Sequence, residues 1–145
     1  MATLFSQIIA GEIPGRFVWA DDVCVVMLTI EPLTDGHCMV VPRAELEQWT
    51  DADEQTWAHL QRVAMAVGRA QQAEWEAPRV GMLLEGFLVP HLHVHVWPAW
   101  SPADVEPHSP MRDVPDDRFE SAAQRLRERL RADGHGEHVV GPGPL

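Results

Sequence analysis

The chain has 145 residues, a hydrophobic content of 46% and a formal net charge of −11 at pH 7. This length suits one domain with its own core and is too short for us to expect two. The acidic balance argues against nucleic acid as a partner, because phosphate neutralisation needs a basic surface. No apolar run approaches the roughly 20 residues that span a bilayer, and the first residues lack a basic signal region, so we expect a cytoplasmic protein with no membrane partner. Cys24 and Cys38 lie in apolar stretches without CxxC spacing, which is typical of buried thiols in a reducing compartment.

The first third of the chain predicts a short helix followed by three strands. The helix is expected over residues 4–10 and stops before the segment "GEIPG". Two strands are expected at about 16–20 and 23–30, joined by a hairpin turn at "ADD". A third strand is expected over 37–42, after the turn-forming segment "EPLTDG".

The middle of the chain predicts the longest helix, over residues 53–75. Asp51 or Asp53 can cap its first turn. Apolar residues then recur at spacings of three and four and form one face, namely Trp57, Leu60, Val63, Ala64, Val67 and Ala70. A fourth strand is expected over 79–85.

The last part of the chain predicts a helix from near Pro115 to Gly134 and then a tail. Residues 135–145 are rich in Gly and Pro, and we expect this tail to be flexible. Five strands with no helix between the first three predict an antiparallel sheet with helices packed to one side. The fold class is therefore α+β, with a single domain over residues 1–134.

The fifth strand is expected in the stretch "VPHLHVHVWP", residues 89–98, which is bracketed by prolines. It places His91, His93 and His95 at every second position. Because alternate side chains of a strand point to opposite faces, the three imidazoles share one side. The other side reads as a core face and consists of Leu92, Val94 and Val96.

Three imidazoles on one face are hard to explain by packing alone, and two functional interpretations remain. Histidines at positions i and i+2 of a strand can chelate zinc, and a third ligand would complete a catalytic site. Alternatively, one imidazole is a nucleophile and its neighbours position groups or donate protons. Each imidazolium lowers the pKa of its neighbours, so some ring stays neutral near pH 7 and can attack phosphorus.

The cupin metal pattern is a sequence test of the zinc interpretation. That pattern requires a Glu a few residues after His-x-His, but Ala99 and Trp100 stand there. A metal-dependent hydrolase would therefore need a carboxylate from elsewhere in the chain.

The chain resembles the histidine triad (HIT) family. Its "HLHVHVW" is similar to the family motif His-x-His-x-His followed by apolar residues, and "TIEPLTDGHCMVVPR" is similar to the segment P-x-x-x-G-H-x-x-V-x-P. The resemblance implies a HIT-like fold and a hydrolase or transferase that acts at the α-phosphate of a nucleotide. It implies a nucleotidyl intermediate on His93, with His91 and His95 as flanking partners and His37 beside the site.

The resemblance also bears on the reaction and its partners. Because the transferase branch typically has Gln at the third position of the motif, His95 implies a hydrolase. The implied substrate is a nucleoside phosphoramidate or a dinucleoside polyphosphate, with no cofactor. A nucleotide-binding or interaction module with little catalysis remains an alternative.

The nucleotide pocket is expected between the first helix and the second strand. Its candidate residues are Leu4, Phe5, Ile8, Met27 and Ile30, although a core role explains them equally well. Thr29 stands where many family members have an Asp for the ribose hydroxyls, and one hydroxyl accepts fewer hydrogen bonds than a carboxylate. The loop before the histidines is short and retains only Gly86 and backbone N–H groups to hold phosphate. Leu88 of the same loop is a further candidate for substrate binding.

Some family members bind a structural zinc through two cysteines, a later histidine and the first histidine of the triad. The matching positions here are Thr3, Ser6, Glu45 and His91. We therefore expect no structural zinc.

The long helix predicts an oligomer. Its apolar residues extend beyond one narrow stripe and include Met65, Ala66 and Trp75. A helix that is apolar over more than one face often packs against two surfaces. Because twofold pairs dominate soluble oligomers and HIT proteins commonly pair in this way, we expect a homodimer built through residues 53–75 and 79–85.

Overall fold

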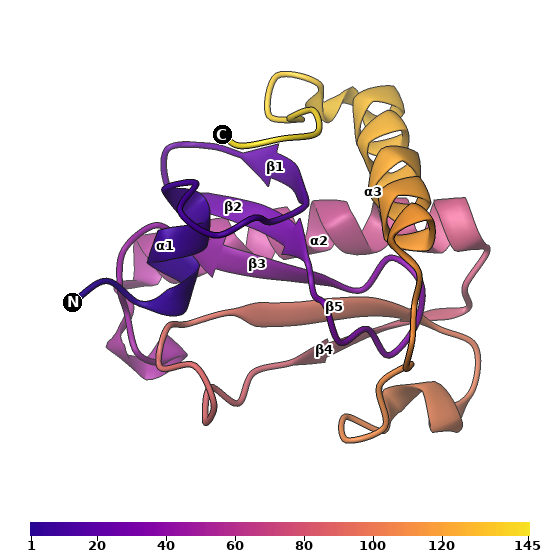
Figure 1. Cartoon of the computed structure of the whole chain (residues 1–145), viewed down its shortest axis with the longest axis horizontal. Helices are drawn as coiled ribbons and strands as arrows, with labels where there is room; N and C mark the ends of the chain where they lie inside the picture. Colours follow the sequence, from indigo (N-terminus) through magenta and orange to yellow (C-terminus); the bar gives the residue numbers. More distant parts are fainter.

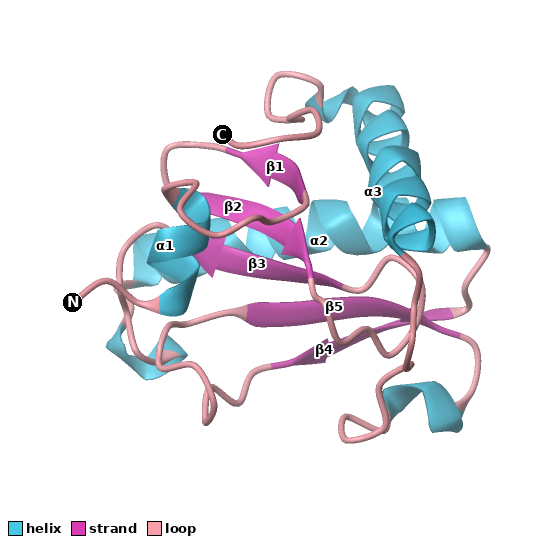
Figure 2. Ribbon diagram, viewed as in Figure 1, coloured by secondary structure: helices cyan, strands magenta, loops and turns pink.

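The structure, a computed structural model that describes residues 1–145, is built on one five-stranded sheet (Figures 1 and 2). The strand order is β1-β2-β3-β5-β4, and every neighbouring pair is antiparallel. The strands are β1 (Phe17–Ala20), β2 (Cys24–Leu28), β3 (Cys38–Pro42), β4 (Arg79–Leu83) and β5 (Val94–Ala99). The predicted antiparallel α+β fold is confirmed.

Three α-helices accompany the sheet: α1 (Leu4–Ile9), α2 (Glu54–Trp75) and α3 (Asp116–Leu130). The side chain of Thr3 caps α1 by accepting the N–H of Ser6, and that of Asp53 caps α2 by accepting the N–H of Thr56. An N-cap oxygen satisfies a backbone donor that has no partner inside the helix. The cap at Asp53, predicted with Asp51 as its alternative, is confirmed.

The two faces of the sheet carry separate apolar clusters, and α1 lies on the opposite face from α2 and α3 (Figure 1). Cys24, Val26 and Leu28 of β2 join the cluster under α2 and α3, whereas Val25 and Met27 join the cluster that includes Phe5 of α1. The expectation that all helices pack to one side is therefore wrong. Burial on both faces explains why β2 and β3 read as continuous apolar runs instead of alternating ones.

Strand β5 is shorter than the histidine stretch suggested. It begins at Val94, so His91 and His93 lie in the segment that enters the strand, which bends at His91, and only His95 is within the strand. Pro98 lies inside β5 opposite Val80 of β4, not at its end. A proline is tolerated there because pairing of β5 with β3 has already ended at Val96.

The tail contacts the sheet over its first half. The N–H of Ala20 donates to the carbonyl of His138, and Val139 forms a β-bridge with Trp19. The rings of His135 and His138 pack against the indole of Trp19, with ring centroids 5.4 and 4.8 Å away. Composition suggested a flexible segment over 135–145, but these contacts hold its first residues against β1.

Three residues of α2 were the basis for predicting a second contact surface, and two of them are packed within the protein itself. Ala66 belongs to the core, and the indole of Trp75 packs against Gly36 and under the guanidinium of Arg125. Only Met65 stays exposed, with 53% of its surface accessible. No helix in the structure is both long enough and apolar enough to cross a membrane.

Candidate active site

The candidate active site is a cleft with a volume of about 780 Å³ on the α1 face of the sheet. It brings together residues from the first helix, β2, the loop after β4 and the histidine segment. The sequence-predicted residues that line it are Leu4, Phe5, Ile8, Met27, Thr29, Ile30, Gly86 and Leu88, together with His37, His93 and His95. His91 is fully buried and does not line the cleft.

Several residues that line the cleft were not predicted from the sequence. Phe87 stands at the mouth beside Leu88, and both side chains are about nine-tenths exposed, at 90% and 89%. His108 and Arg112 reach the cleft from the segment after β5, which is tied down by the hydrogen bond from the Met111 N–H to the Pro32 carbonyl. No sequence pattern signals this contact, because it depends on how the chain returns across the sheet.

Hydrogen bonds fix the proton positions of His37 and His95. Nδ1 of His37 accepts the N–H of Leu33 at 3.0 Å, so its proton is on Nε2. Nε2 of His37 therefore donates to Nδ1 of His95 at 2.9 Å. Neutral His95 then carries its proton on Nε2, which is a donor available to the cleft.

The opposite tautomer holds at His93. Its Nδ1 lies 2.7 Å from the carbonyl oxygen of His91, and because a carbonyl can only accept, Nδ1 carries the proton. Its Nε2 therefore has a free lone pair at the cleft. The rings of His93 and His95 have centroids 4.9 Å apart, so a lone pair and an N–H donor lie side by side.

Burial keeps these imidazoles neutral at physiological pH. It lowers the pKa of His37 to about 3, with a further contribution from the neighbouring His95. Burial and then the adjacent His93 lower the pKa of His95 to about 4. Burial also lowers the pKa of His93 itself. A neutral ring with a free Nε2 is the form that attacks phosphorus.

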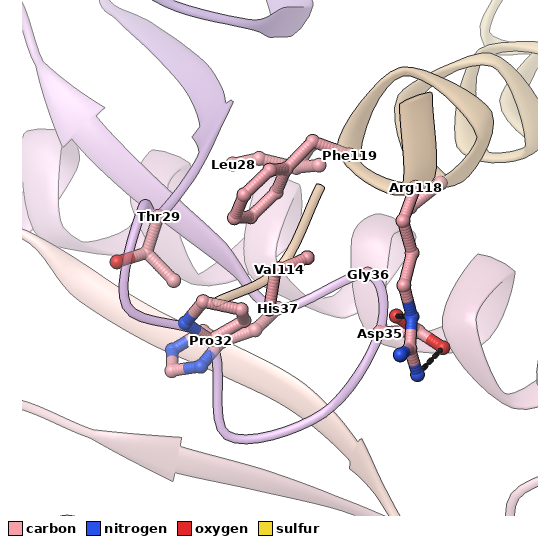
Figure 3. Close-up of a pocket in the computed structure, with 10 residues that line it drawn as sticks. Leu28, Thr29, Pro32, Asp35, Gly36, His37, Val114, Arg118 and Phe119 are labelled. Atoms are coloured by element: carbon pink, nitrogen blue, oxygen red, sulfur yellow. Dashed lines mark hydrogen bonds and ion pairs between the residues drawn. The ribbon is translucent and has the colours of Figure 1, made fainter. Parts of the chain in front are cut away.

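A second, much smaller pocket lies behind the loop that carries His37 (Figure 3). Its volume of about 10 Å³ leaves room for no more than a water. Figure 3 shows an ion pair between Asp35 and Arg118, whose closest atoms are 2.8 Å apart. The ion pair connects the loop before His37 to α3, and the pocket is too small for a nucleotide.

The family model described as the HIT domain matches residues 10–100, which is more than half of the chain. The chain belongs to the HIT family. Its relatives include a HIT-like protein of Saccharolobus solfataricus, which is 26% identical over 135 residues and covers 88% of this chain and 97% of its own. A HIT-like protein of Mycobacterium tuberculosis is 27% identical over 135 residues, covering 90% of this chain and 94% of its own.

Solved structures share the HIT-like fold. A hypothetical histidine triad nucleotide-binding protein of Sulfolobus tokodaii has a TM-score of 0.78 and 28% identity, covering 88% of this chain and 91% of its own. A zinc-bound histidine triad family protein of Mycobacterium smegmatis has a TM-score of 0.76 and 23% identity, covering 94% and 98%. The predicted recognition of the family is confirmed.

The positions that correspond to zinc ligands in some HIT proteins do come together in this chain. Thr3, Ser6, Glu45 and His91 form one hydrogen-bonded group, with the Thr3 hydroxyl 2.6 Å from Nδ1 of His91 and the Ser6 hydroxyl 2.6 Å from Glu45 Oε1. Structural zinc sites use thiolate and imidazole donors, and two of these four groups are neutral hydroxyls. The donor set does not fit the metal.

We expect EDTA to leave the melting temperature and any turnover of this HIT protein unchanged. The Glu45 carboxylate accepts hydrogen bonds from the Ser6 hydroxyl and the Thr3 N–H, so these groups are satisfied without a metal. Thermal unfolding with and without chelator, combined with metal analysis of the purified protein, measures this. Stoichiometric zinc that is required for turnover would contradict it and favour a metal-dependent hydrolase.

A further cluster, formed by Asp21, Cys24 and His59, is satisfied without a metal. The two carboxylate oxygens of Asp21 accept hydrogen bonds from the N–H groups of Val23 and Cys24, from Trp19 Nε1, and from Nε2 of His59 at 2.8 Å. These donors hold the pKa of Asp21 at about 2 despite its burial. The cluster closes the turn between β1 and β2.

The low histidine pKa values predict that stability falls in mild acid. The rings of His37 and His95 stay neutral when folded but gain protons near pH 6.5 when unfolded, so acid favours the unfolded chain. Their contribution is complete above that pH and is lost towards pH 4 and 3, at roughly 1.4 kcal/mol per pH unit for each ring.

Urea unfolding at about pH 7.5 and about pH 5 measures this loss. The variant His37→Leu should lose less stability over this range than the wild type. Exposed His108 offers a control, since His108→Ala should retain the wild-type slope. Equal slopes for the wild type and His37→Leu would reject the buried-imidazole explanation.

Proposed function

We propose that the protein is a nucleotide hydrolase that cleaves at the α-phosphate of a nucleoside phosphoramidate or dinucleoside polyphosphate. The observation that carries this proposal is the pairing of a free Nε2 lone pair on His93 with an Nε2–H donor on His95 in one cleft. Membership of the HIT family supports the general class.

The reaction would have two steps. Nε2 of His93 attacks the α-phosphorus, a P–N bond to the enzyme forms, and the bond to the leaving group breaks. The Nε2–H of His95 donates a hydrogen bond to the departing nitrogen or oxygen, and this group takes its proton from solvent, because a neutral imidazole that lost its one proton would become an imidazolate. Water then attacks phosphorus, its proton passes to solvent, and the bond to His93 breaks to release nucleoside monophosphate.

The apolar wall of the cleft suits a nucleobase. Phe5 and Met27 are buried in the cluster beneath it, while Ile30 and Leu88 are largely exposed at its rim. Thr29 has little exposed surface, and its hydroxyl already accepts the N–H of Glu31 at 3.2 Å. Thr29 therefore offers one donor and one remaining lone pair to a ribose, and apolar contact with the base would dominate binding.

The engaged hydroxyl of Thr29 favours one alternative, a nucleotide-binding module with little catalysis. Titration calorimetry with nucleoside monophosphates, alongside turnover of phosphoramidates and dinucleoside polyphosphates, separates the two functions. Turnover with release of nucleoside monophosphate supports the hydrolase. Nucleotide binding without turnover supports the module, and the absence of both contradicts the proposed function.

We further propose that the protein acts as a homodimer through α2 and β4. Strand β4 is an edge of the sheet, and its Met82 and the Met65 of α2 are both about half exposed, at 46% and 53%. Pairing would cover an edge whose backbone groups are otherwise open to another strand. The two free, buried cysteines fit a reducing compartment, so we place this activity in the cytoplasm.

We expect light scattering at micromolar concentration to give twice the 16.3 kDa mass of one chain. The variant Met82→Lys should shift this mass toward that of a monomer, because a charge would be buried without a partner at the interface. Exposed Val105, on the segment after β5, provides the control variant Val105→Lys, which should leave the mass unchanged. A monomer mass for the wild type would reject the dimer.

A further inference from the structure

A chain of short hydrogen bonds links the buried ring of His91 to a surface carboxylate. Nδ1 of His91 lies 2.6 Å from the hydroxyl oxygen of Thr3, which lies 3.1 Å from that of Ser6. The Ser6 hydroxyl donates to Oε1 of Glu45 at 2.6 Å, and the N–H of Thr3 donates to the same oxygen at 3.0 Å. These hydrogen bonds connect α1 and the segment after β3 to the histidine motif.

The hydrogens of this chain have one consistent arrangement when His91 is neutral. Nε2 of His91 lies 2.8 Å from the carbonyl of Pro42 and must donate to it, so Nδ1 is an acceptor. The Thr3 hydroxyl therefore donates to Nδ1, and the Ser6 hydroxyl donates to Glu45. No hydrogen is then left between the two hydroxyl oxygens, so Thr3 is joined to Glu45 through its own backbone N–H and to Ser6 through the Ser6 N–H. Hydrogen bonds from Ser6 and Thr3 keep the pKa of Glu45 below its ordinary value, so its charge anchors the chain.

The backbone of His91 in turn positions the ring of His93. The carbonyl oxygen of His91 accepts the proton on Nδ1 of His93, which leaves Nε2 of His93 free. Phe5, from the same helix as Ser6, packs edgewise on both imidazoles, with centroid distances of 5.6 and 4.9 Å. A displacement of α1 or of His91 would therefore move the group that faces the cleft.

We infer that Thr3, Ser6 and Glu45 are positioning residues for this site, which fix the tautomer and orientation of His91 and through it the direction of the His93 lone pair. The effect on turnover rests on the proposed function, whereas the effect on the His91 ring does not. His91 is fully buried, so a lost partner at Nδ1 is not replaced freely by bulk water. The ring must then move or exchange tautomers, and His93 moves with it.

The matched variants Thr3→Val and Thr3→Ser test this inference. Val keeps the shape of Thr but has no hydroxyl, whereas Ser keeps the hydroxyl. We expect kcat to fall about tenfold in Thr3→Val, with a change of less than about twofold in the Kd for nucleoside monophosphate, because misorientation affects reaction more than binding. Thr3→Ser should restore kcat to within about twofold of the wild type.

Nitrogen-15 NMR of the histidine side chains provides a readout that does not depend on turnover. In the wild type we expect one His91 tautomer, with the proton on Nε2 and a hydrogen-bonded Nδ1. The Nδ1 resonance should shift in Thr3→Val and return in Thr3→Ser. A similar, smaller shift is expected in Glu45→Ala. Glu47→Ala removes an exposed carboxylate that takes no part in these hydrogen bonds and should leave the His91 resonances unchanged.

Loss of the helix cap is controlled separately, since Thr3 also caps α1. Asp53→Ala removes the equivalent cap of α2 and should leave kcat and the His91 resonances unchanged. An unshifted Nδ1 resonance in Thr3→Val would overturn the inference, as would shifted resonances with unchanged kcat. A wild type without turnover would contradict the proposed function. The nitrogen-15 resonances would then still test whether the hydrogen bonds from Thr3, Ser6 and Glu45 fix the His91 ring.

Discussion

The variant His93→Ala is expected to abolish hydrolysis, with a loss of turnover of at least about a thousandfold. Of the three histidines His37, His93 and His95, only His93 has a free Nε2 lone pair at the cleft, since its Nδ1 proton is donated to the His91 carbonyl. Without this nitrogen, water would have to attack phosphorus directly. Release of nucleoside monophosphate, measured by chromatography, reports the loss.

Two control measurements test whether the loss of turnover is specific to the nucleophile. Circular dichroism and the melting temperature of His93→Ala should stay close to those of the wild type, because His93 lines the cleft and removal of its side chain enlarges the cleft without leaving a closed cavity. His135→Ala, which removes an imidazole beside Trp19 and outside the cleft, should keep full activity. Retention of even a tenth of wild-type turnover by His93→Ala would show that another group attacks phosphorus.

The largest expected effect on stability is that of Gly36→Ala, which should lower the free energy of unfolding by roughly 2–4 kcal/mol. Gly36 has φ +81°, a conformation that is strained for residues with a side chain. A Cβ there would also lie 2.6 Å from the indole of Trp75. Because the Gly36 carbonyl accepts from Gln71 Nε2 at 2.8 Å, movement of the loop would break a buried hydrogen bond.

Urea unfolding measures this loss, and the chain offers a matched control. Gly141→Ala adds the same methyl group where no atom lies within 4 Å and the backbone is not strained, so its stability should be unchanged. Because His37 follows Gly36 directly, Gly36→Ala should also weaken turnover. Equal stabilities for the two alanine variants would contradict the packing described around Trp75.

Much of the fold could be predicted because each element carries a local signal. The cap at Asp53, the 3.6-residue period of α2 and the turn residues before β3 each act over a few neighbouring positions. The placement of α1 on the second face could not be predicted in this way. It depends on burial of both faces of β2 and β3, which a continuous apolar run does not distinguish from a single buried face.

For the candidate site too, local features could be predicted from the sequence and contacts between distant residues could not. The histidine alternation indicated a shared face, but the tautomers depend on partners distant in the chain, namely Leu33 for His37 and Thr3 for His91. Likewise, Arg112 reaches the cleft only because a backbone hydrogen bond ties its segment to Pro32. Such contacts are set by the packing of the whole chain and leave no periodic pattern in the sequence.

A covalent intermediate on His93 is the central claim, and intact mass tests it most directly. A nucleoside 5′-phosphorofluoridate is a suitable probe, because fluoride leaves without needing a proton. In His95→Ala the first step can then proceed, while the second step lacks the Nε2–H donor that stabilises charge on the phosphoryl oxygens. The reaction is stopped in alkaline denaturant, since a phosphorus–nitrogen bond to histidine is labile in acid.

We predict that His95→Ala gains the mass of one nucleoside monophosphate residue and that peptide mapping places the adduct on His93. The double variant His93→Ala/His95→Ala, mixed with the same probe, should show no gain. An adduct of equal yield in the double variant, or none in His95→Ala although the wild type turns the probe over, would contradict the covalent account.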